Sequence, residues 1–101
     1  MKIDYKDEEV KVLIDKYAAD ELVPAIQLVD EDGFPYVTAT VYLEDYNYEP
    51  GEVTIKNYSE NEGILDVLIE HDIVSRPKMF YPTGHVLVPV CDLFLKTDGN
   101  N

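Results

Sequence analysis

The fold is decided by residues 23–43, which read VPAIQLVDEDGFPYVTATVYL. An apolar segment, Val23–Val29, precedes the turn sequence Asp30-Glu31-Asp32-Gly33, and a segment of almost pure β propensity, Tyr36–Leu43, follows it. Aspartate followed by glycine supplies the positive φ angles that a tight turn between strands needs, so these residues predict a β-hairpin. In its second strand we expect Val37, Ala39, Val41 and Leu43 on the core face and Tyr36, Thr38, Thr40 and Tyr42 on the other.

Further strand candidates flank this hairpin: Lys2–Tyr5, Val10–Tyr17, Val53–Lys56 and Val86–Leu95. The second of them alternates apolar and polar side chains with the period of two that a half-buried strand has. Pro89 lies within the last candidate and favours an edge position or a bulge there, because proline has no N–H to offer a central strand. Residues 73–83 contain Pro77 and Pro82 and are interpreted as irregular.

One helix is expected at about 60–71. Ser59, followed three residues later by Glu62, has the spacing of a capping box, in which each side chain satisfies a free backbone N–H of the first turn. The apolar side chains that follow recur at helical spacing and form one stripe: Ile64, Leu65, Leu68 and Ile69. The predicted fold class is therefore α+β, a mainly antiparallel sheet of five to six strands with this helix on one face. We expect a single domain over residues 1–96 and a disordered tail over 97–101.

The chain has a net charge of −13 in 101 residues, yet 46% of its residues are hydrophobic, which is typical of a globular domain. Between Tyr17 and Ile55 there are nine carboxylates and no Lys or Arg. A surface of this kind repels nucleic acid and attracts proteins that bind nucleic acid. Stability should respond to salt, because added ions screen the repulsion between carboxylates.

The acidic residues fall mainly in the predicted turns. If successive strands pair, alternate turns lie at opposite ends of the sheet. One end would then hold Asp7, Glu8, Glu9, Asp30, Glu31 and Asp32, and the other Asp20, Glu21, Glu44, Asp45, Glu49 and Glu52. The alternative for the first end is an ordinary solvated hairpin tip, since such tips commonly use Asp, Glu and Gly.

The second acidic end contains the segment that we predict to bind another protein, the loop Glu44–Glu52. Tyr46 and Tyr48 alternate there with carboxylates in a segment too polar to be core. Tyrosine supplies rigid contact area with a polar tip and is enriched in binding surfaces. The alternative is that both rings only cover the end of the sheet.

The sequence contains no motif for catalysis, a metal or a cofactor, and we expect none of the three. Catalysis by paired carboxylates needs one of them buried in a cleft, whereas these acids lie in predicted turns. The Asp30-Glu31-Asp32 tip lacks the ligand pattern of a calcium loop. Cys91 is the only cysteine and lies in an apolar run, which indicates a small buried hydrophobe rather than a nucleophile. His71 falls at the predicted helix end, where it suits the helix dipole.

The N-terminal residues contain no apolar signal core. No run in the chain approaches the roughly 18 apolar residues of a membrane span. We therefore expect a cytosolic protein that does not act at a membrane.

Five segments carry a resemblance: Leu13–Ala18, Ala25–Asp30, Tyr36–Val41, Ile55–Leu65 and Pro89–Cys91. Together they resemble a family of small uncharacterised proteins, a domain of unknown function, found on plasmids, conjugative elements and prophages of Gram-positive bacteria. The resemblance covers most of residues 10–95, and the run YSENEGIL at 58–65 is its most specific part. Family members usually carry a proline-containing loop where Tyr46-Asn47-Tyr48 stands and a glycine where Asp72 stands.

The resemblance implies residence on a mobile element, and small acidic proteins of such elements often disable host defence by occupying nucleic-acid-binding surfaces. The leading hypothesis is a non-enzymatic inhibitor of anti-CRISPR or anti-restriction type. Its acidic ends would dock on the basic channel of a host nuclease, and it would not itself bind nucleic acid. The rival hypothesis is a structural or regulatory accessory protein of the element that self-associates as a homodimer through a sheet edge.

Overall fold

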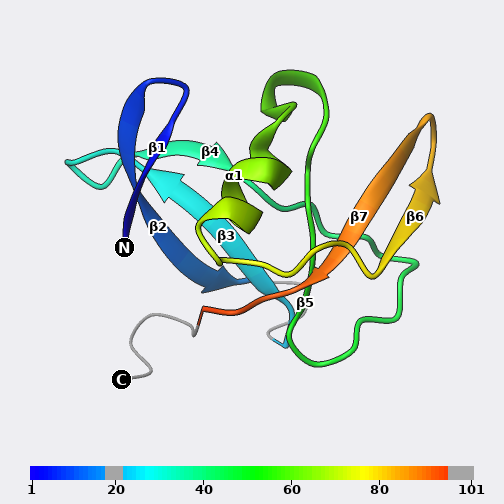
Figure 1. The fold of residues 1–101 in the computed structure, drawn as a ribbon. Coiled ribbons are helices and arrows are strands. Elements are labelled where there is room, and N and C mark those ends of the chain that lie inside the picture. Colours follow the sequence, from blue (N-terminus) through cyan, green and yellow to red (C-terminus); the bar gives the residue numbers. More distant parts are fainter. Residues whose placement is uncertain (18–21, 96–101) are drawn as a thin grey trace.

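The computed structural model describes residues 1–17 and 22–95, which form two antiparallel sheets and a short α-helix (Figure 1). The elements are β1 (Lys2–Tyr5), β2 (Glu8–Lys16), β3 (Pro24–Val29), β4 (Pro35–Thr38), β5 (Glu52–Thr54), the 3-10 helix η1 (Ser59–Asn61), α1 (Ile64–Glu70), β6 (Met79–Thr83) and β7 (Val86–Asp92). The α+β class is confirmed. The prediction of five to six strands in one sheet is wrong, because the strands divide into a four-stranded and a three-stranded sheet. The predicted tail, 97–101, lies outside the described residues.

The four-stranded sheet is a meander in which β1, β2, β3 and β4 pair in sequence order. The predicted hairpin is confirmed: the turn between β3 and β4 places Gly33 at φ 87°, and the Gly33 N–H donates to the carbonyl of Asp30 at 3.0 Å. Residues directly opposite one another in antiparallel strands share a face. The apolar face of this sheet is built from such pairs, Val12 with Leu28 and Ile14 with Ile26, all of which are buried.

The chain passes from the first sheet to the second at Ala39–Val41, immediately after β4. The Ala39 N–H donates to the carbonyl of Ile26 in β3, whereas the Ala39 carbonyl accepts from the Lys56 N–H just beyond β5. The Val41 N–H then donates to the Thr54 carbonyl at 3.0 Å. The predicted strand Tyr36–Leu43 is therefore divided between two sheets.

This change of partner overturns the predicted position of Thr40. Thr40 was expected on the outer face with the tyrosines, but it is buried and forms an isolated bridge with Ile55. Its hydroxyl oxygen lies 2.7 Å from the Tyr17 hydroxyl and accepts a hydrogen bond from the Ile26 N–H at 3.2 Å. The alternation of faces fails here because the residue lies between two sheets rather than within one.

The three-stranded sheet has the order β5-β7-β6, so β7 is its central strand. The prediction of an edge position for Pro89 is wrong. The last pair between β5 and β7 joins Thr54 and Val90, so Pro89 lies beyond the end of β5. Its carbonyl accepts from the Ile55 N–H, and the N and O of one strand residue point the same way. The nitrogen of Pro89 therefore points toward Ile55, the residue after the end of β5, so the missing N–H removes no hydrogen bond between the paired residues of β5 and β7.

The edge strands of this sheet are β5 and β6, and β6 lies within a segment predicted to be irregular. Pro82 is the penultimate residue of β6 and pairs with Leu87 of β7. Proline is tolerated on an edge strand, because the outward N–H groups of that strand have no partner strand. Its low β propensity is the reason that the sequence analysis did not predict a strand here.

The helical segment is confirmed in place but divided in two, with Gly63 at φ 96° between η1 and α1. The predicted capping box is wrong, because Ser59 and Glu62 do not provide a side-chain cap. Instead the Asn57 side-chain oxygen accepts from the Gly63 N–H at 3.1 Å and from the Leu65 N–H at 2.9 Å. The left-handed turn at Gly63 brings these two donors to one acceptor, and an L side chain rarely adopts that conformation.

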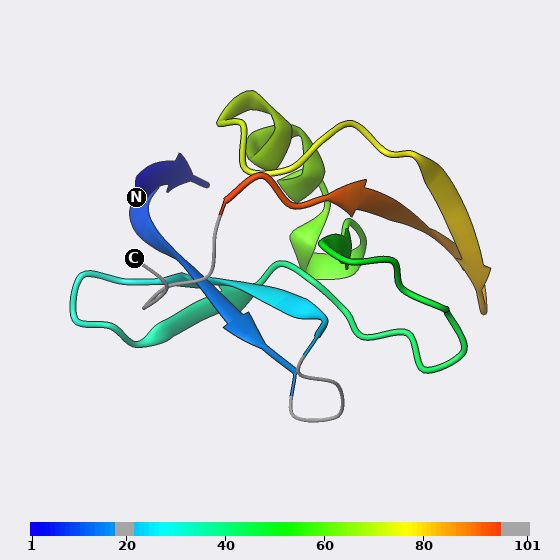
Figure 2. The same ribbon diagram turned by 90° about the horizontal axis from the view of Figure 1, so that it is seen from below.

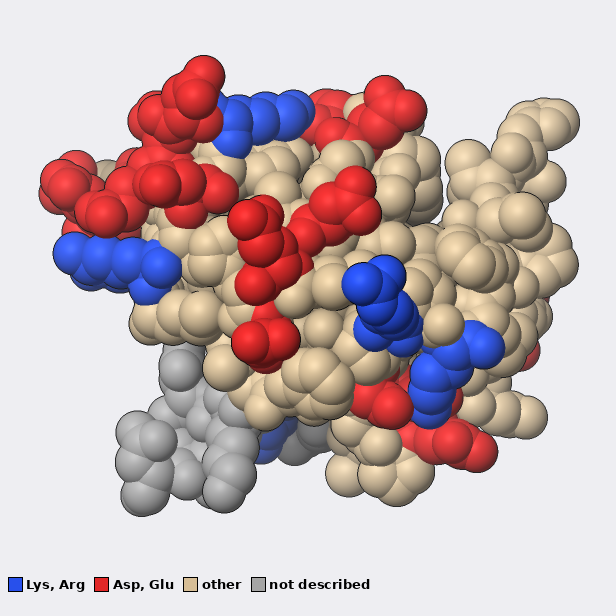
Figure 3. Space-filling view, viewed as in Figure 1, with Lys and Arg blue, Asp and Glu red and all other residues tan. Residues whose placement is uncertain are grey.

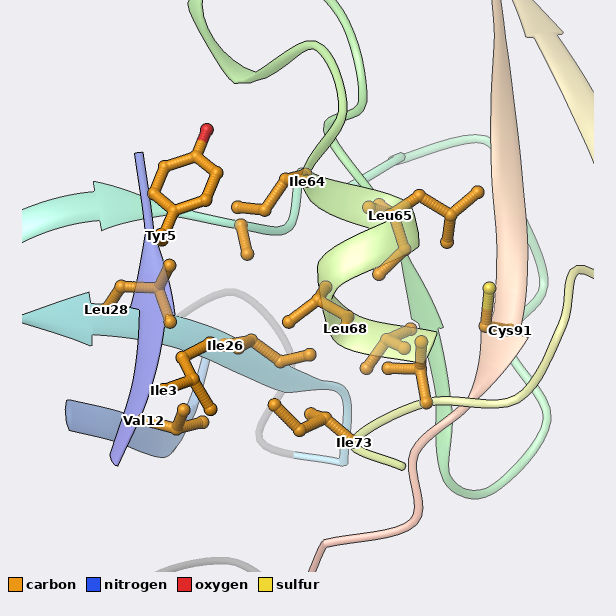
Figure 4. Close-up of a cluster of buried hydrophobic side chains, with 14 of the residues drawn as sticks. Ile3, Tyr5, Val12, Ile26, Leu28, Ile64, Leu65, Leu68, Ile73 and Cys91 are labelled. Carbon is orange, nitrogen blue, oxygen red and sulfur yellow. The ribbon is translucent and has the colours of Figure 1, made fainter. Parts of the chain in front are cut away.

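The core lies where α1 meets both sheets. Three residues of the predicted apolar stripe, Ile64, Leu65 and Leu68, are buried, and Ile69 packs against the same cluster. Figure 4 shows Leu65 directed toward Cys91 of β7 and Leu68 directed toward the four-stranded sheet. In the view from below, α1 and β7 lie on one side of this core and β2 and β3 on the other (Figure 2).

Removing the Asn57 cap is expected to weaken the fold. The substitution Asn57→Ala leaves the N–H groups of Gly63 and Leu65 without their acceptor and should lower the free energy of unfolding by about 1 kcal/mol. Ser59→Ala removes a hydroxyl without a capping role and should change it by less than about 0.5 kcal/mol. Urea unfolding of both variants measures the difference, and an effect of Ser59→Ala as large as that of Asn57→Ala would contradict this assignment.

Candidate binding surface

The loop Glu44–Glu52 is held to the body of the protein by the side chain of Tyr48. The Leu43 N–H donates to the Tyr48 hydroxyl oxygen at 3.0 Å, and the same oxygen lies 2.7 Å from Thr54 Oγ1. Thr54 Oγ1 in turn donates to the carbonyl of Val41. Tyr48 is half-buried. Its polar end is therefore used inside the protein, where it joins the start of the loop to β5.

Glu52 is the second anchor of the loop. Its side chain is only 3% exposed, and Oε1 accepts from the Tyr46 hydroxyl at 2.7 Å and from the Glu49 N–H at 2.9 Å. Oε2 lies 2.6 Å from Lys78 Nζ. The prediction that Glu52 contributes to an exposed acidic surface is wrong, because a buried carboxylate needs a cation and hydrogen-bond donors, and the fold supplies both.

Lys78 neutralises part of the span that lacks Lys and Arg in the sequence. Besides Glu52, its Nζ lies 3.0 Å from Asp92 Oδ1 and 3.8 Å from Glu49 Oε1. Lys78 immediately precedes β6, far from the loop in sequence. This second acidic end is therefore less negative than the sequence alone indicates.

The pKa shifts in this network follow from its contacts. Burial acts to raise the pKa of Glu52, but hydrogen bonds from Lys78, from the Glu49 N–H and from Tyr46 outweigh it and hold the pKa below its ordinary value. Burial, together with the hydrogen bond to the Glu52 carboxylate, raises the pKa of Tyr46 to about 12. Hydrogen bonds to Glu52 and Asp92 raise the pKa of Lys78. Glu52 and Lys78 are therefore both charged at neutral pH, and Tyr46 keeps its proton.

Five tyrosines form a continuous row beside the loop and connect the two sheets. The rings contact one another in the order Tyr17, Tyr42, Tyr48, Tyr46 and Tyr81, with centroid separations of 4.9 to 5.7 Å. Tyr17 follows β2 and Tyr81 belongs to β6, so the row runs from one sheet to the other. Such ring pairs each stabilise the fold by about 0.5–1.5 kcal/mol beyond their burial. Tyr46 and Tyr48 therefore do cover the end of the sheet, which was the alternative to a binding role for them.

The remaining predicted residues of this end are Glu44, Asp45 and Glu49, all of which are exposed. They line the outside of the loop, and the Asp45 carbonyl accepts from the Tyr81 hydroxyl at 3.4 Å. Asp20 and Glu21, assigned to the same end, lie outside the described residues.

The first acidic end is formed as the meander predicts, because the β1–β2 and β3–β4 turns lie at the same end of the sheet. Asp7, Glu8 and Glu9 are exposed, and so are Glu31 and Asp32. Asp30 differs from its neighbours, since its Oδ1 accepts from the N–H groups of Asp32 and Phe34 at 2.9 Å each. The Asp30 carboxylate therefore shapes the turn, while Glu31 and Asp32 face solvent.

A third group of carboxylates, on the helical segment, extends this end. Lys6 Nζ donates to the Glu60 carbonyl at 2.6 Å and so brings the β1–β2 turn beside η1. Figure 3 shows carboxylates over both hairpin turns and onward over η1 and α1, on one side of the molecule. We call this surface the acidic face; its exposed members are Asp7, Glu8, Glu9, Glu31, Asp32, Glu60, Glu62, Asp66 and Glu70. The regular spacing of Glu62, Asp66 and Glu70 along the helical segment was the available sequence signal.

The residues considered for chemistry have structural roles. Cys91 is buried in the core as predicted, and burial raises the pKa of its thiol to about 12. His71 follows α1, and its Nδ1 lies 2.9 Å from the Val67 carbonyl of that helix. Among the described residues, no three His, Cys, Asp or Glu side chains gather as metal ligands do. No helix within the described ranges is long and apolar enough to cross a membrane.

The chain matches no protein-family model, no curated protein and no solved structure.

Tyr48→Phe is expected to loosen the loop. The variant removes the acceptor of the Leu43 N–H and the partner of Thr54, and should lower the free energy of unfolding by about 1–2 kcal/mol. The matched control is Tyr36→Phe, which removes the hydroxyl of a tyrosine that is 44% exposed and should change stability by less than about 0.5 kcal/mol. Urea unfolding measures both variants, and equal effects would show that the Tyr48 hydroxyl is not an anchor.

Glu52→Gln is expected to remove a pH-dependent part of the stability. A carboxyl group whose pKa is lowered in the folded state stabilises the fold above its ordinary pKa, here 4.5, and this contribution is lost as the pH falls through the folded value. The variant should be less stable than the wild type by about 1–3 kcal/mol at neutral pH, and the difference should shrink below about pH 4.5. Thermal unfolding between pH 3 and pH 7 measures it.

Glu44→Gln is the control for this series, since it removes an exposed carboxylate from the same loop. Its difference from the wild type should stay small at every pH. A Glu52→Gln difference that is constant across the pH range would mean that the Glu52 charge contributes nothing to stability.

Proposed function

We propose that this chain is a non-enzymatic acidic protein, carried by a mobile element, that inhibits a nucleic-acid-binding defence protein of its bacterial host by occupying that protein's basic surface. The acidic face is the observation that carries the proposal. It displays nine exposed carboxylates from two hairpin turns and the helical segment. A basic channel that binds phosphates with Lys and Arg can pair with carboxylates presented on a rigid surface. Action in the host cytoplasm, without direct binding to nucleic acid, belongs to this proposal.

Rigidity supports the acidic face as a binding surface. The β1–β2 turn is tied to η1 by the Lys6 contact, and Asp30 fixes the β3–β4 turn from within. The α1 helix that carries Asp66 and Glu70 is anchored in the core by its opposite side. The backbone that carries these carboxylates is therefore ordered before a partner binds, which favours affinity.

The nine carboxylates of the acidic face outnumber the cations beside them, Lys2, Lys6, Lys11 and Lys56, so the face keeps a net negative charge. Lys2 approaches Glu9 at 3.9 Å with both side chains more than half exposed, and Lys56 pairs with Glu60 at 2.8 Å. The hydrogen bond from Lys56 holds the pKa of Glu60 below its ordinary value, so Glu60 stays ionised. Ion pairs at the surface contribute little to stability, so these side chains can exchange them for contacts with another protein.

The loop Glu44–Glu52 is less suited to the same role. Its tyrosines and Glu52 bond within the protein, and Lys78 reduces its charge. Glu44, Asp45 and Glu49 remain available to a partner. We therefore assign the main contact to the acidic face and treat the exposed loop carboxylates as the comparison.

The experiment compares two variants of equal net charge. One removes three charges from the acidic face, Glu8→Gln, Glu9→Gln and Asp66→Asn; the other removes three from the loop, Glu44→Gln, Asp45→Asn and Glu49→Gln. Each protein is immobilised and used to capture proteins from a bacterial lysate at about 0.05 M salt, with elution by about 0.5 M salt. The wild type and the loop variant should capture a basic nucleic-acid-binding protein, whereas the acidic-face variant should capture at least about tenfold less.

The captured protein is then tested for competition. Fluorescence anisotropy of labelled DNA or RNA bound to it should fall when the wild-type chain is added, because both ligands would use the same basic surface. Recovery of no such protein at low salt would contradict the proposal. An equal loss of capture in both variants would show that net charge, rather than the acidic face, determines binding.

A further inference from the structure

The longest stretch of this chain without a charged side chain is Met79–Cys91, which spans β6, its turn and most of β7. We call it the arm. It projects from the body of the molecule in both ribbon views (Figures 1 and 2). Figure 3 shows almost no carboxylate or cation over the arm, although the same view displays the acidic face.

One face of the arm is covered by the protein at its centre, although Met79 on the same face is 43% exposed. Tyr81 and Val88 are opposite one another and share this face. Val88 is 0% exposed, and the Tyr81 ring contacts the ring of Tyr46 at 5.3 Å. The loop Glu44–Glu52 therefore lies against this side of the arm.

The other face, which we call the outer face, is apolar but only partly covered. Phe80 is opposite Pro89, and Pro82 is opposite Leu87, so the register places these four side chains together. At the base of this face, Pro89 is buried and Cys91 faces α1 (Figure 4). Farther out, Phe80 is 51% exposed and Leu87 is 63% exposed. A strand that is apolar on both sides normally has both sides covered, and here one is left open.

We propose that the outer face is covered by the outer face of a second copy of this chain. The charge distribution favours this occupant over a basic partner. Two copies, each with a net charge of −13, repel one another wherever their carboxylates meet, and the outer face is a surface that carries none. A basic partner is instead attracted to the acidic face. On the outer face its cations would lose water against Phe80 and Leu87 and gain no carboxylate or hydrogen-bond acceptor in return.

The two copies pack face to face rather than edge to edge. β6 is an edge strand, but Pro82 removes an N–H from it and so disfavours the addition of a further strand. Packing of the same patch on both copies gives a two-fold contact, the commonest symmetry of homodimers. The acidic faces then lie away from the contact.

Analytical ultracentrifugation of the full chain, over a concentration series at about 0.05 M and about 1 M salt, tests the proposal. The expected result is a monomer–dimer equilibrium that shifts toward the dimer as salt rises, because salt screens the repulsion and does not weaken apolar contact. Binding through the acidic face responds in the opposite direction, so this experiment and the capture experiment can fail independently. A monomer at all concentrations and both salts, or a dimer that dissociates in high salt, would overturn the proposal.

Leu87→Lys locates the contact. The substitution makes the net charge less negative, which by itself favours association, so any loss of the dimer must come from the outer face. We expect the dimer dissociation constant to rise at least about tenfold. The control is Phe34→Lys, which makes the same charge change at a residue that is 66% exposed in the β3–β4 turn, and it should leave the constant unchanged or lower it.

Thermal unfolding of both variants verifies that they fold as the wild type does. Phe80→Ser serves as a second outer-face variant and should weaken the dimer in the same way. Equal effects of Leu87→Lys and Phe34→Lys on the dissociation constant would overturn the assignment to the outer face.

Discussion

The structure depends on the exchange of hydrogen-bond partners at Ala39. Its N–H belongs to the first sheet, through Ile26, and its carbonyl belongs to the second, through Lys56. The Thr40 hydroxyl, bonded to Tyr17 and to the Ile26 N–H, satisfies the polar groups that this crossing buries. The junction contacts the second half of the chain at Lys56, which directly precedes the capping residue Asn57, and at Thr54, the last residue of β5. A one-residue shift at the junction would turn Thr40 toward solvent and expose Ala39.

The passage of the chain from one sheet to the other at Ala39–Val41 also accounts for the tyrosines and carboxylates of the loop Glu44–Glu52. After Leu43 the chain leaves the body of the protein as a loop, and it must come back to begin β5 of the second sheet at Glu52. The Tyr48 hydroxyl bonds to Leu43 before the loop and to Thr54 after it. Glu52 joins the loop to Lys78 and thereby to the start of β6. Tyr48 and Glu52, which the sequence analysis assigned to a binding surface, therefore help to hold the two sheets together.

The features that the sequence predicts correctly are local ones. The Asp30–Gly33 turn, the apolar stripe of α1 and the burial of Cys91 each follow from the properties of neighbouring residues. The errors concern residues whose partners are distant in the chain. Pro89 is acceptable in a central strand only because β5 is short, which its own segment does not reveal.

The same limit applies to the candidate site. The sequence shows that Tyr17–Ile55 lacks Lys and Arg, but it does not show that Lys78 is brought to Glu52, since that pairing depends on the crossing at Ala39. The helical carboxylates had a regular spacing, but only the Lys6 contact with the Glu60 carbonyl joins them to the hairpin turns. Patterns identify which residues carry charge, whereas long-range contacts decide which of those charges act together.

The distribution of charge over the surface links the two proposed associations. Repulsion between acidic faces opposes contact between two copies even when their outer faces are apolar. A basic partner on the acidic face, as proposed, would neutralise that repulsion and so favour pairing through the outer face. Because coupling between two binding equilibria is reciprocal, pairing must also strengthen the binding of the basic partner. On these two proposals, a chain with its carboxylates on one side and an uncharged arm on the other would couple recognition of a basic protein to its own dimerisation, without any change in its fold.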